Sequence, residues 1–143
     1  MILVDVNLPV HALNSNSPVH EKARRWWDDQ LSGVRPVGLP WAVIFGFVRI
    51  TTSPRILAEP LSVSEAIGYV NSWFEQPCVR AVEPLDGHWA LAASLLEQAG
   101  VGGSLTTDVH LAALAIQHGC ELCSTDTDFA RFPTLRWRNP LLG

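Results

Sequence analysis

Short apolar runs alternate with longer segments of helical periodicity along most of this chain, and that alternation restricts the fold more than any other feature. A strand that is followed by a helix needs a crossover connection, which produces parallel strands whose two faces are covered by helices. The sequence therefore predicts a three-layer α/β/α sandwich with a mainly parallel central sheet. The strands are predicted at residues 2–4, 34–39, 78–82, 120–124 and 135–138, the last at an edge.

Cap and stop residues bound the helices. Ser62 and Glu65 have the spacing of a capping box, and Thr106 or Thr107 can cap the last helix. The helix that follows Pro40 is almost entirely apolar, which predicts burial on most of its sides. The helices are predicted at residues 7–13, 18–32, 40–53, 62–75, 86–99 and 106–118.

The composition is that of one globular domain. With 143 residues, of which 48% are hydrophobic, the chain can bury one core and is too short for two ordinary domains, so we expect a single domain over residues 1–143. No apolar stretch reaches the roughly 18 residues of a membrane span, and the first residues lack the basic leader of a signal peptide. These features predict a cytoplasmic protein with no membrane partner. The net charge of −4 argues mildly against holding long nucleic acids by charge alone, but allows binding of a short single-stranded loop.

Three cysteines, Cys78, Cys120 and Cys123, cannot form a full disulfide set. Cys120 and Cys123 form a C-x-x-C motif. They lie in a predicted strand, whereas a redox pair opens a helix, and no second pair completes a zinc site. We therefore expect buried structural thiols.

Acidic residues follow the predicted strands, where parallel sheets place functional sites. Asp5 ends the first strand, Asp126 follows the fourth, and Asp108 lies in the first turn of a helix that can point at the same edge. Converging carboxylates repel one another unless a dication holds them, and bound Mg²⁺ or Mn²⁺ can activate water for phosphodiester cleavage. Taken singly, these residues also fit a helix cap, a helix-dipole contact and a turn. Together they predict a metal site.

Four segments resemble PIN-domain nucleases, in particular the toxins of VapBC toxin–antitoxin pairs. The segments are ILVDVN (2–7), LPWAVIFGFVR (39–49), TTDVHLAALA (106–115) and STDTDFARFP (124–133). The last two are the most specific, and the resemblance covers the whole chain. It implies a PIN-like fold and a type II toxin that hydrolyses RNA, such as transfer or ribosomal RNA, at a Mg²⁺- or Mn²⁺-dependent acidic cluster.

The resemblance assigns roles to six residues. Metal ligation and catalysis are carried onto Asp5, Asp108 and Asp126. Orientation of the ligands or of water is carried onto Asn7, Thr125 and Asp128.

One position departs from the family pattern. Many PIN domains carry a glutamate in the buried third helix, and the best register places Gly46 there, with no carboxylate between Asp29 and Glu59. Asp128 can compensate, or water can fill the vacant coordination position, because Mg²⁺ usually keeps several waters. The departure also leaves open a weakened scaffold that acts only as a binding module.

The resemblance implies partners as well as chemistry. An antitoxin of the VapB type would lie along a groove formed by the early helices, with Trp26, Trp27 and Arg49 as candidate contacts, and the toxin would form a homodimer. Arg131, Arg136 and Arg138 are the densest basic group, for which RNA contact and ordinary solvation are equal alternatives.

A phosphatase is the remaining alternative, because Asp126-Thr-Asp128 after a strand matches the D-x-D motif of aspartate-nucleophile phosphotransferases. It fits poorly. Those enzymes need a lysine and further acidic residues downstream, and no Lys, Asp or Glu follows Asp128.

Overall fold

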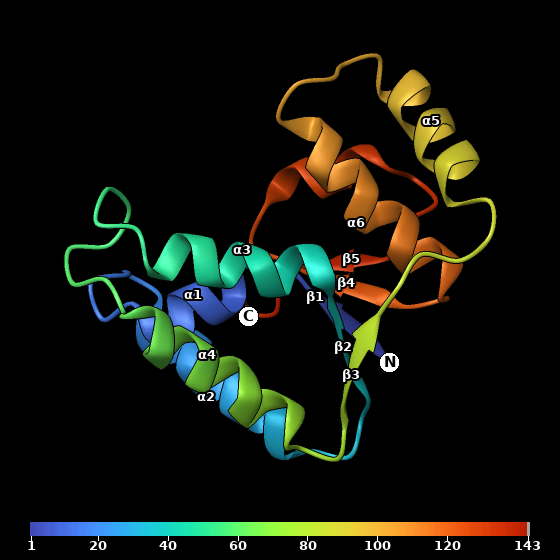
Figure 1. The fold of residues 1–143 in the computed structure, drawn as a ribbon. Helices are drawn as coiled ribbons and strands as arrows, with labels where there is room; N and C mark the ends of the chain where they lie inside the picture. The colour runs from blue at the N-terminus through green and yellow to red at the C-terminus, as the bar shows by residue number, and fades with distance from the viewer. Residues whose placement is uncertain (143) are drawn as a thin grey trace.

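The computed structural model describes residues 1–142 and contains a five-stranded parallel sheet between helices (Figure 1). All neighbouring strands are parallel, so the predicted α/β/α architecture is confirmed. The strands are β1 (Ile2–Val4), β2 (Val37–Pro40), β3 (Val79–Val82), β4 (Glu121–Cys123) and β5 (Trp137–Arg138), in the spatial order β3-β2-β1-β4-β5. The helices are α1 (Asn7–Leu13), α2 (His20–Ser32), α3 (Trp41–Thr51), α4 (Val63–Phe74), α5 (His88–Ala99), α6 (Leu105–Gln117) and a 3₁₀ helix, η1 (Thr127–Arg131).

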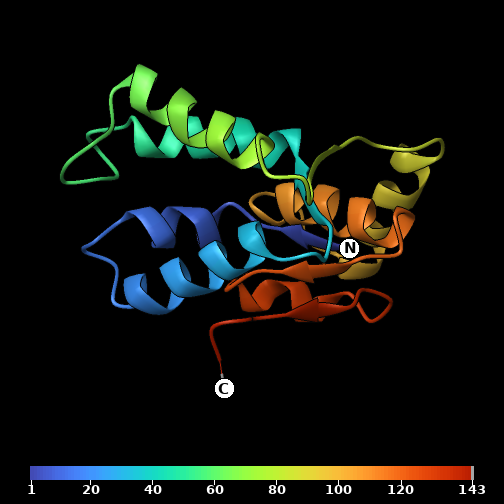
Figure 2. The ribbon, with the colours of Figure 1, turned by 90° about the horizontal axis from the view of Figure 1, so that it is seen from below.

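Alternate side chains of β1 enter two separate cores. Leu3 packs with the apolar residues of α5 and α6, whereas Ile2 and Val4 pack with those of α1 and α2. Figure 1 shows α5 and α6 together at one end of the molecule, away from α1, α2 and α4, and Figure 2 shows α1 and α2 as an antiparallel pair. β1 and β2 are buried along their whole length, as expected of central strands covered on both faces, whereas the edge strands β3 and β5 carry exposed residues.

The strand order reverses direction at β1. The chain moves outward from β1 to β2 and β3, and then returns to place β4 on the other side of β1. Crevices at the carboxyl ends of strands flanking such a switch point are where open α/β sheets bind ligands. Asp5 directly follows β1 and Ser124 directly follows β4, so both residues lie at that position.

Three local predictions were wrong at their boundaries. β2 begins at Val37 instead of residue 34, and Val34 is 98% exposed. Thr106 and Thr107 lie inside α6, which begins at Leu105, so neither caps it. The polar segment after β4 continues into η1, whose first turn is capped by the Asp126 side chain.

The apolar helix α3 is less buried than its sequence predicts. Phe47 is fully buried, but Trp41 and Phe45 are 42% and 70% exposed. Because these two residues are four positions apart, they form an apolar stripe on the outer face of α3. Within residues 1–142, no helix combines the length and apolarity needed to cross a bilayer.

The cysteine prediction is confirmed. Cys78, Cys120 and Cys123 are free and buried. Burial raises the pKa of the Cys123 thiol to about 11. The thiolate form that reacts and binds metals is therefore rare at neutral pH, which fits a structural role.

Candidate metal centre

The first carboxylate of the centre, Asp5, is buried at the end of β1 with only 6% of its surface exposed. Its Oδ1 accepts a hydrogen bond from the backbone N–H of Val6 at 2.7 Å. Its Oδ2 accepts from Ser124 Oγ at 2.7 Å and from Asn7 Nδ2 at 3.1 Å. Burial raises the pKa of Asp5, the negative charge of Asp126 adds to this, and the three donated bonds oppose it.

Ser124 joins the ends of β1 and β4. Besides donating to Asp5, its Oγ accepts from Asn7 Nδ2 and from the backbone N–H of Asp126, both at 3.0 Å. Since these last two partners are donors, the single hydroxyl hydrogen is committed to Asp5. Sequence reasoning missed Ser124; its only signal was a small hydroxyl residue directly after an apolar strand and two positions before Asp126.

Asn7 holds the loop after β4 against the start of α1. Its Oδ1 accepts from the backbone N–H of Thr125 at 3.2 Å, while its Nδ2 donates to both Asp5 and Ser124. The side-chain amide is thus used at both ends, in an orientation fixed by its partners. Thr125 takes part in this network through its backbone N–H.

Three further carboxylates lie beside this network. Asp108, Asp126 and Asp128 each offer an oxygen within 4.8 Å of the others, close enough for one cation to reach all three. Asp128 was expected to orient other groups or to compensate for the missing glutamate, and its carboxylate belongs to this set. The 3₁₀ helix η1 begins here, and Asp126 Oδ1 accepts from the Asp128 backbone N–H at 2.9 Å. Asp5 lies outside the set of three but acts on it through its charge.

The electrostatics of the cluster favour a cation. Burial, followed in order of size by the negative charges of Asp126, Asp5 and Asp128, together raise the pKa of Asp108 to about 6. A donor set made only of carboxylate oxygens suits Mg²⁺ or Mn²⁺, and a dication would remove the mutual repulsion. The residues present therefore fit a hard divalent metal ion.

Gly46 lies in α3 beside Val6, which directly follows Asp5 in the chain. A Cβ atom at this position would lie 3.5 Å from Val6 Cγ2, an ordinary contact distance. A methyl group is therefore sterically acceptable at Gly46, so contacts of the Cβ atom do not require glycine there.

The three predicted RNA-contact arginines have different partners. Arg131 lies next to the cluster, with its Nε 3.8 Å from Asp128 Oδ1. Arg136 instead donates to the carbonyl oxygen of Gly119, which follows the carboxyl end of α6. Arg138 pairs with Glu121, at the start of β4, at 3.1 Å. Of the three, only Arg131 contacts a residue of the acidic cluster.

Of the three residues that were predicted to contact a partner, Trp27 lines a groove, whereas Trp26 and Arg49 do not. A groove of about 390 Å³ lies between α1, α2, α3 and α4, and Trp27 lines it. Trp26 stacks on Trp27 with ring centroids 6.1 Å apart but does not line the groove. Arg49 lies outside the groove and continues the outer stripe of α3 one turn beyond Phe45.

We expect Asn7→Asp to destabilise the protein by about 2 kcal/mol at neutral pH, because it removes two donated hydrogen bonds and places a second negative charge beside Asp5. Asn139→Asp is the matched control, since Asn139 uses only its Oδ1, as an acceptor from Leu141, and a carboxylate keeps that bond. Urea unfolding of both variants measures the difference. Equal stabilities would contradict the role of the Asn7 amide.

Comparison with known proteins identifies relatives along the whole chain. A family model described as PIN domain matches residues 2–135. The chain is 44% identical over 141 residues to "Ribonuclease VapC33" of Mycobacterium tuberculosis, covering 99% of both chains. It is 38% identical to "Ribonuclease VapC37" of the same organism, covering 98% of this chain and 97% of the relative.

Solved structures share the fold. The crystal structure of Mycobacterium tuberculosis VapC20, described as a sarcin-ricin loop cleaving toxin, superposes with a TM-score of 0.70 at 16% identity and covers 96% of this chain and 99% of that chain. A chain of VapBC2 from Rickettsia felis, solved bound to a promoter DNA fragment, gives 0.68 at 16% identity, with 96% and 98% covered. At these identities the likeness establishes the shared architecture.

Proposed function

Because the chain belongs to the PIN domain family and its curated relatives are VapC ribonucleases, we propose that it is a metal-dependent endoribonuclease toxin. The observation that carries the proposal is the convergence of Asp108, Asp126 and Asp128 beside buried Asp5. The first three side chains would hold Mg²⁺ or Mn²⁺, and the charge of Asp5 would act on the same ion. When bound, the metal supplies an activated water and stabilises charge that develops on the phosphate.

The chain's own residues prepare the centre. Ser124 and Asn7 fix the orientation of the Asp5 carboxylate, and the Asp126 side chain is oriented by accepting from the backbone of Asp128. Arg131 lies beside the cluster, paired with Asp128, and we assign it the contact with an RNA phosphate. The substrate class that we favour is a single-stranded loop of transfer or ribosomal RNA, since the negative net charge offers little grip on a long duplex.

Incubation of the purified protein with total RNA tests the activity. Discrete fragments are expected with Mg²⁺ or Mn²⁺ and none with a chelator. Calorimetry with Mn²⁺ is the second measurement. If the protein neither cuts RNA nor binds millimolar Mn²⁺, the nuclease proposal is wrong, and a scaffold that only binds a partner is the better description.

The partner in this proposal is an antitoxin of the VapB type, seated in the groove between α1, α2, α3 and α4. Solved structures of similar fold include complexes named VapBC. The groove supports such docking because Trp27, Phe47 and Trp73 supply an apolar floor. Co-expression with the product of the adjacent reading frame should yield a stable complex in which RNA cleavage is inhibited.

A homodimer is the second part of the proposed assembly. The stripe of Trp41 and Phe45 on α3 supports it, because exposed aromatic side chains on one helix face are typical of protein interfaces. We expect Phe45→Glu to weaken self-association about thirtyfold or more by placing a charge in the interface. Sedimentation equilibrium measures this, with Ile56→Glu as an exposed control outside α3. A wild-type protein that stays monomeric at high concentration would exclude the dimer.

A further inference from the structure

The groove between the helices has an aromatic floor. Trp27 and Trp73 pack edge to face with centroids 5.4 Å apart, and Phe47 packs against Trp73 at 4.6 Å. Tyr69, 43% exposed, lines the groove from α4. The groove has a volume of about 390 Å³, which is large enough for several side chains but too small for a folded domain. This floor suits the apolar face of a peptide segment.

One wall of the groove carries a stripe of polar and charged side chains. His20, Arg24 and Asp28 are spaced by four residues on α2, so they form a line along one face of the helix, and all three line the groove. Among residues 1–142, neither Arg24 nor Asp28 forms an ion pair. Both charges therefore face the groove without an intramolecular counter-ion.

The order of Arg24 and Asp28 along α2 does not favour an ion pair within the helix. A basic residue four positions before an acidic one is the less favourable order for an (i, i+4) pair. Arg24 precedes Asp28, and their side chains do not meet within ion-pair distance. A requirement for helix stability does not explain this arrangement, whereas recognition of a partner with complementary charges does.

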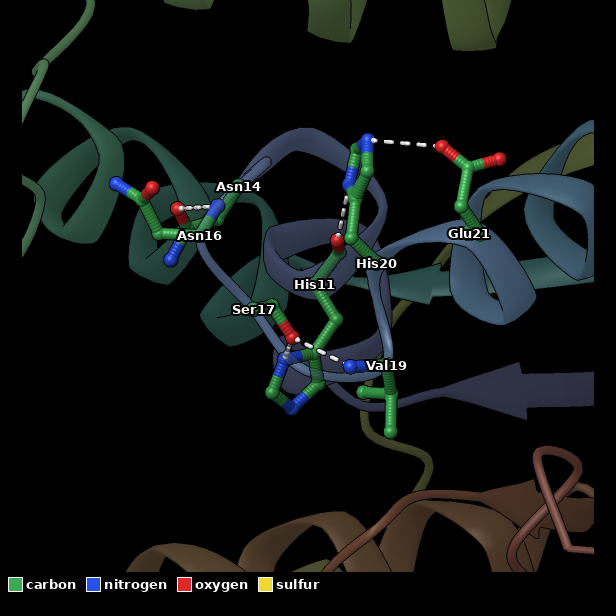
Figure 3. Close-up of polar contacts among 7 residues, drawn as sticks. All are labelled: His11, Asn14, Asn16, Ser17, Val19, His20 and Glu21. Atoms are coloured by element: carbon green, nitrogen blue, oxygen red, sulfur yellow. Dashed lines mark hydrogen bonds and ion pairs between the residues drawn. The ribbon is translucent and has the colours of Figure 1, made fainter.

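His20 is held at the end of the stripe by the turn between α1 and α2 (Figure 3). Its Nδ1 lies 3.0 Å from the carbonyl oxygen of His11 and must donate to it, because a carbonyl oxygen only accepts. His11 is itself fixed by Ser17, whose Oγ lies 2.8 Å from His11 Nδ1. These hydrogen bonds fix the position of His20 at the first residue of the stripe.

We propose that Arg24 and Asp28, in the stripe that begins at His20, select the docked segment by charge and set its direction. The inference rests on the proposed antitoxin complex and specifies its chemistry. The segment would present apolar side chains to the floor, an acidic residue to Arg24 and a basic residue to Asp28. The two partner charges would lie about 6 Å apart along α2, one helical turn. A segment running in the opposite direction would place like charges together. RNA fits poorly, because its phosphates would meet Asp28.

Charge reversals on α2 test the proposal. Arg24→Glu and Asp28→Arg change the groove wall, and Arg25→Glu and Asp29→Arg are matched controls, since these neighbours are exposed and do not line the groove. The probe is the product of the adjacent reading frame, purified and titrated by calorimetry. Each groove reversal should weaken binding about tenfold or more, and each control by less than about threefold. The difference should shrink in 1 M salt.

The outcomes separate this inference from the function on which it rests. If the partner binds but all four reversals have equal effects, the charge stripe is not a selector, while the toxin–antitoxin proposal stands. If wild-type protein binds no partner, both are overturned. If the groove reversals alone weaken binding but the protein does not cut RNA, the inference holds and the nuclease proposal fails. Thermal unfolding of each variant verifies that it is folded.

Discussion

Asp108→Asn is expected to reduce RNA cleavage about a thousandfold or more. In the proposed mechanism a bound metal would supply several kcal/mol of transition-state stabilisation, and each 1.36 kcal/mol corresponds to a factor of ten in rate. The substitution replaces one of the three carboxylates around the proposed cation position with an uncharged amide. Cleavage assays against wild type and against Asp86→Asn, an exposed acid before α5, measure the loss. An Asp108→Asn variant that stays fully active would remove this residue from the centre.

The same substitution should increase the stability of the metal-free protein. Asp108 has an ordinary pKa of 3.8, raised to about 6 in the folded chain, so the folded state binds the proton more tightly than the unfolded state. Stability from this group is therefore full below pH 3.8 and is lost as the pH rises towards 6. We expect the urea midpoint of the wild type to fall as the pH rises over this range. The Asp108→Asn variant should show a smaller fall. Addition of Mn²⁺ should restore the stability of the wild type at pH 7. A flat wild-type profile would contradict the raised pKa.

Gly38→Ala should produce the largest loss of stability from a single added methyl group. Gly38 lies in β2, between β1 and β3, with Leu3 and Arg80 as its register partners. A Cβ atom there would lie 2.5 Å from Leu3 Cδ2 and 2.7 Å from Val82 Cγ2. Both side chains are buried and Val82 is β-branched, so neither can move away freely. Overpacking of this kind costs about 1–3 kcal/mol.

Gly68→Ala is the matched control for this prediction. Gly68 lies inside α4, where an added Cβ atom meets nothing within 4 Å. Alanine favours a helix interior over glycine, so this variant should gain about 0.5–1 kcal/mol. Chemical denaturation of both variants compares the same chemical change at two sites. A Gly38→Ala protein as stable as wild type would show that the sheet can relax around the methyl group.

The sheet and the position of the acidic residues could be predicted from sequence because both follow from short-range patterns. Apolar runs of three to six residues identified the strands, and alternation with helices required parallel pairing. The carboxyl edge of such a sheet then placed Asp5 near Asp126 without any coordinates. In the structure the charges of Asp126 and Asp5 both act on Asp108, in agreement with that expectation.

The remaining features depend on contacts between distant segments. The hydroxyl of Ser124 gains its role only when β4 pairs with β1, 119 positions away from its acceptor on Asp5. Asp128 joins the carboxylate set because the chain turns into η1, which a polar turn sequence does not specify. The exposed stripe of Trp41 and Phe45 was unpredictable for another reason, since an apolar helix that covers a core and one that meets a second protein have the same composition.

The pairing of β1 with β4 also has a consequence for biosynthesis. Asp5 is translated well before positions 124–128, which complete its surroundings. A growing polypeptide therefore cannot assemble the acidic centre until that later segment has been made. Any activity that depends on this centre would be absent from the nascent chain up to that point.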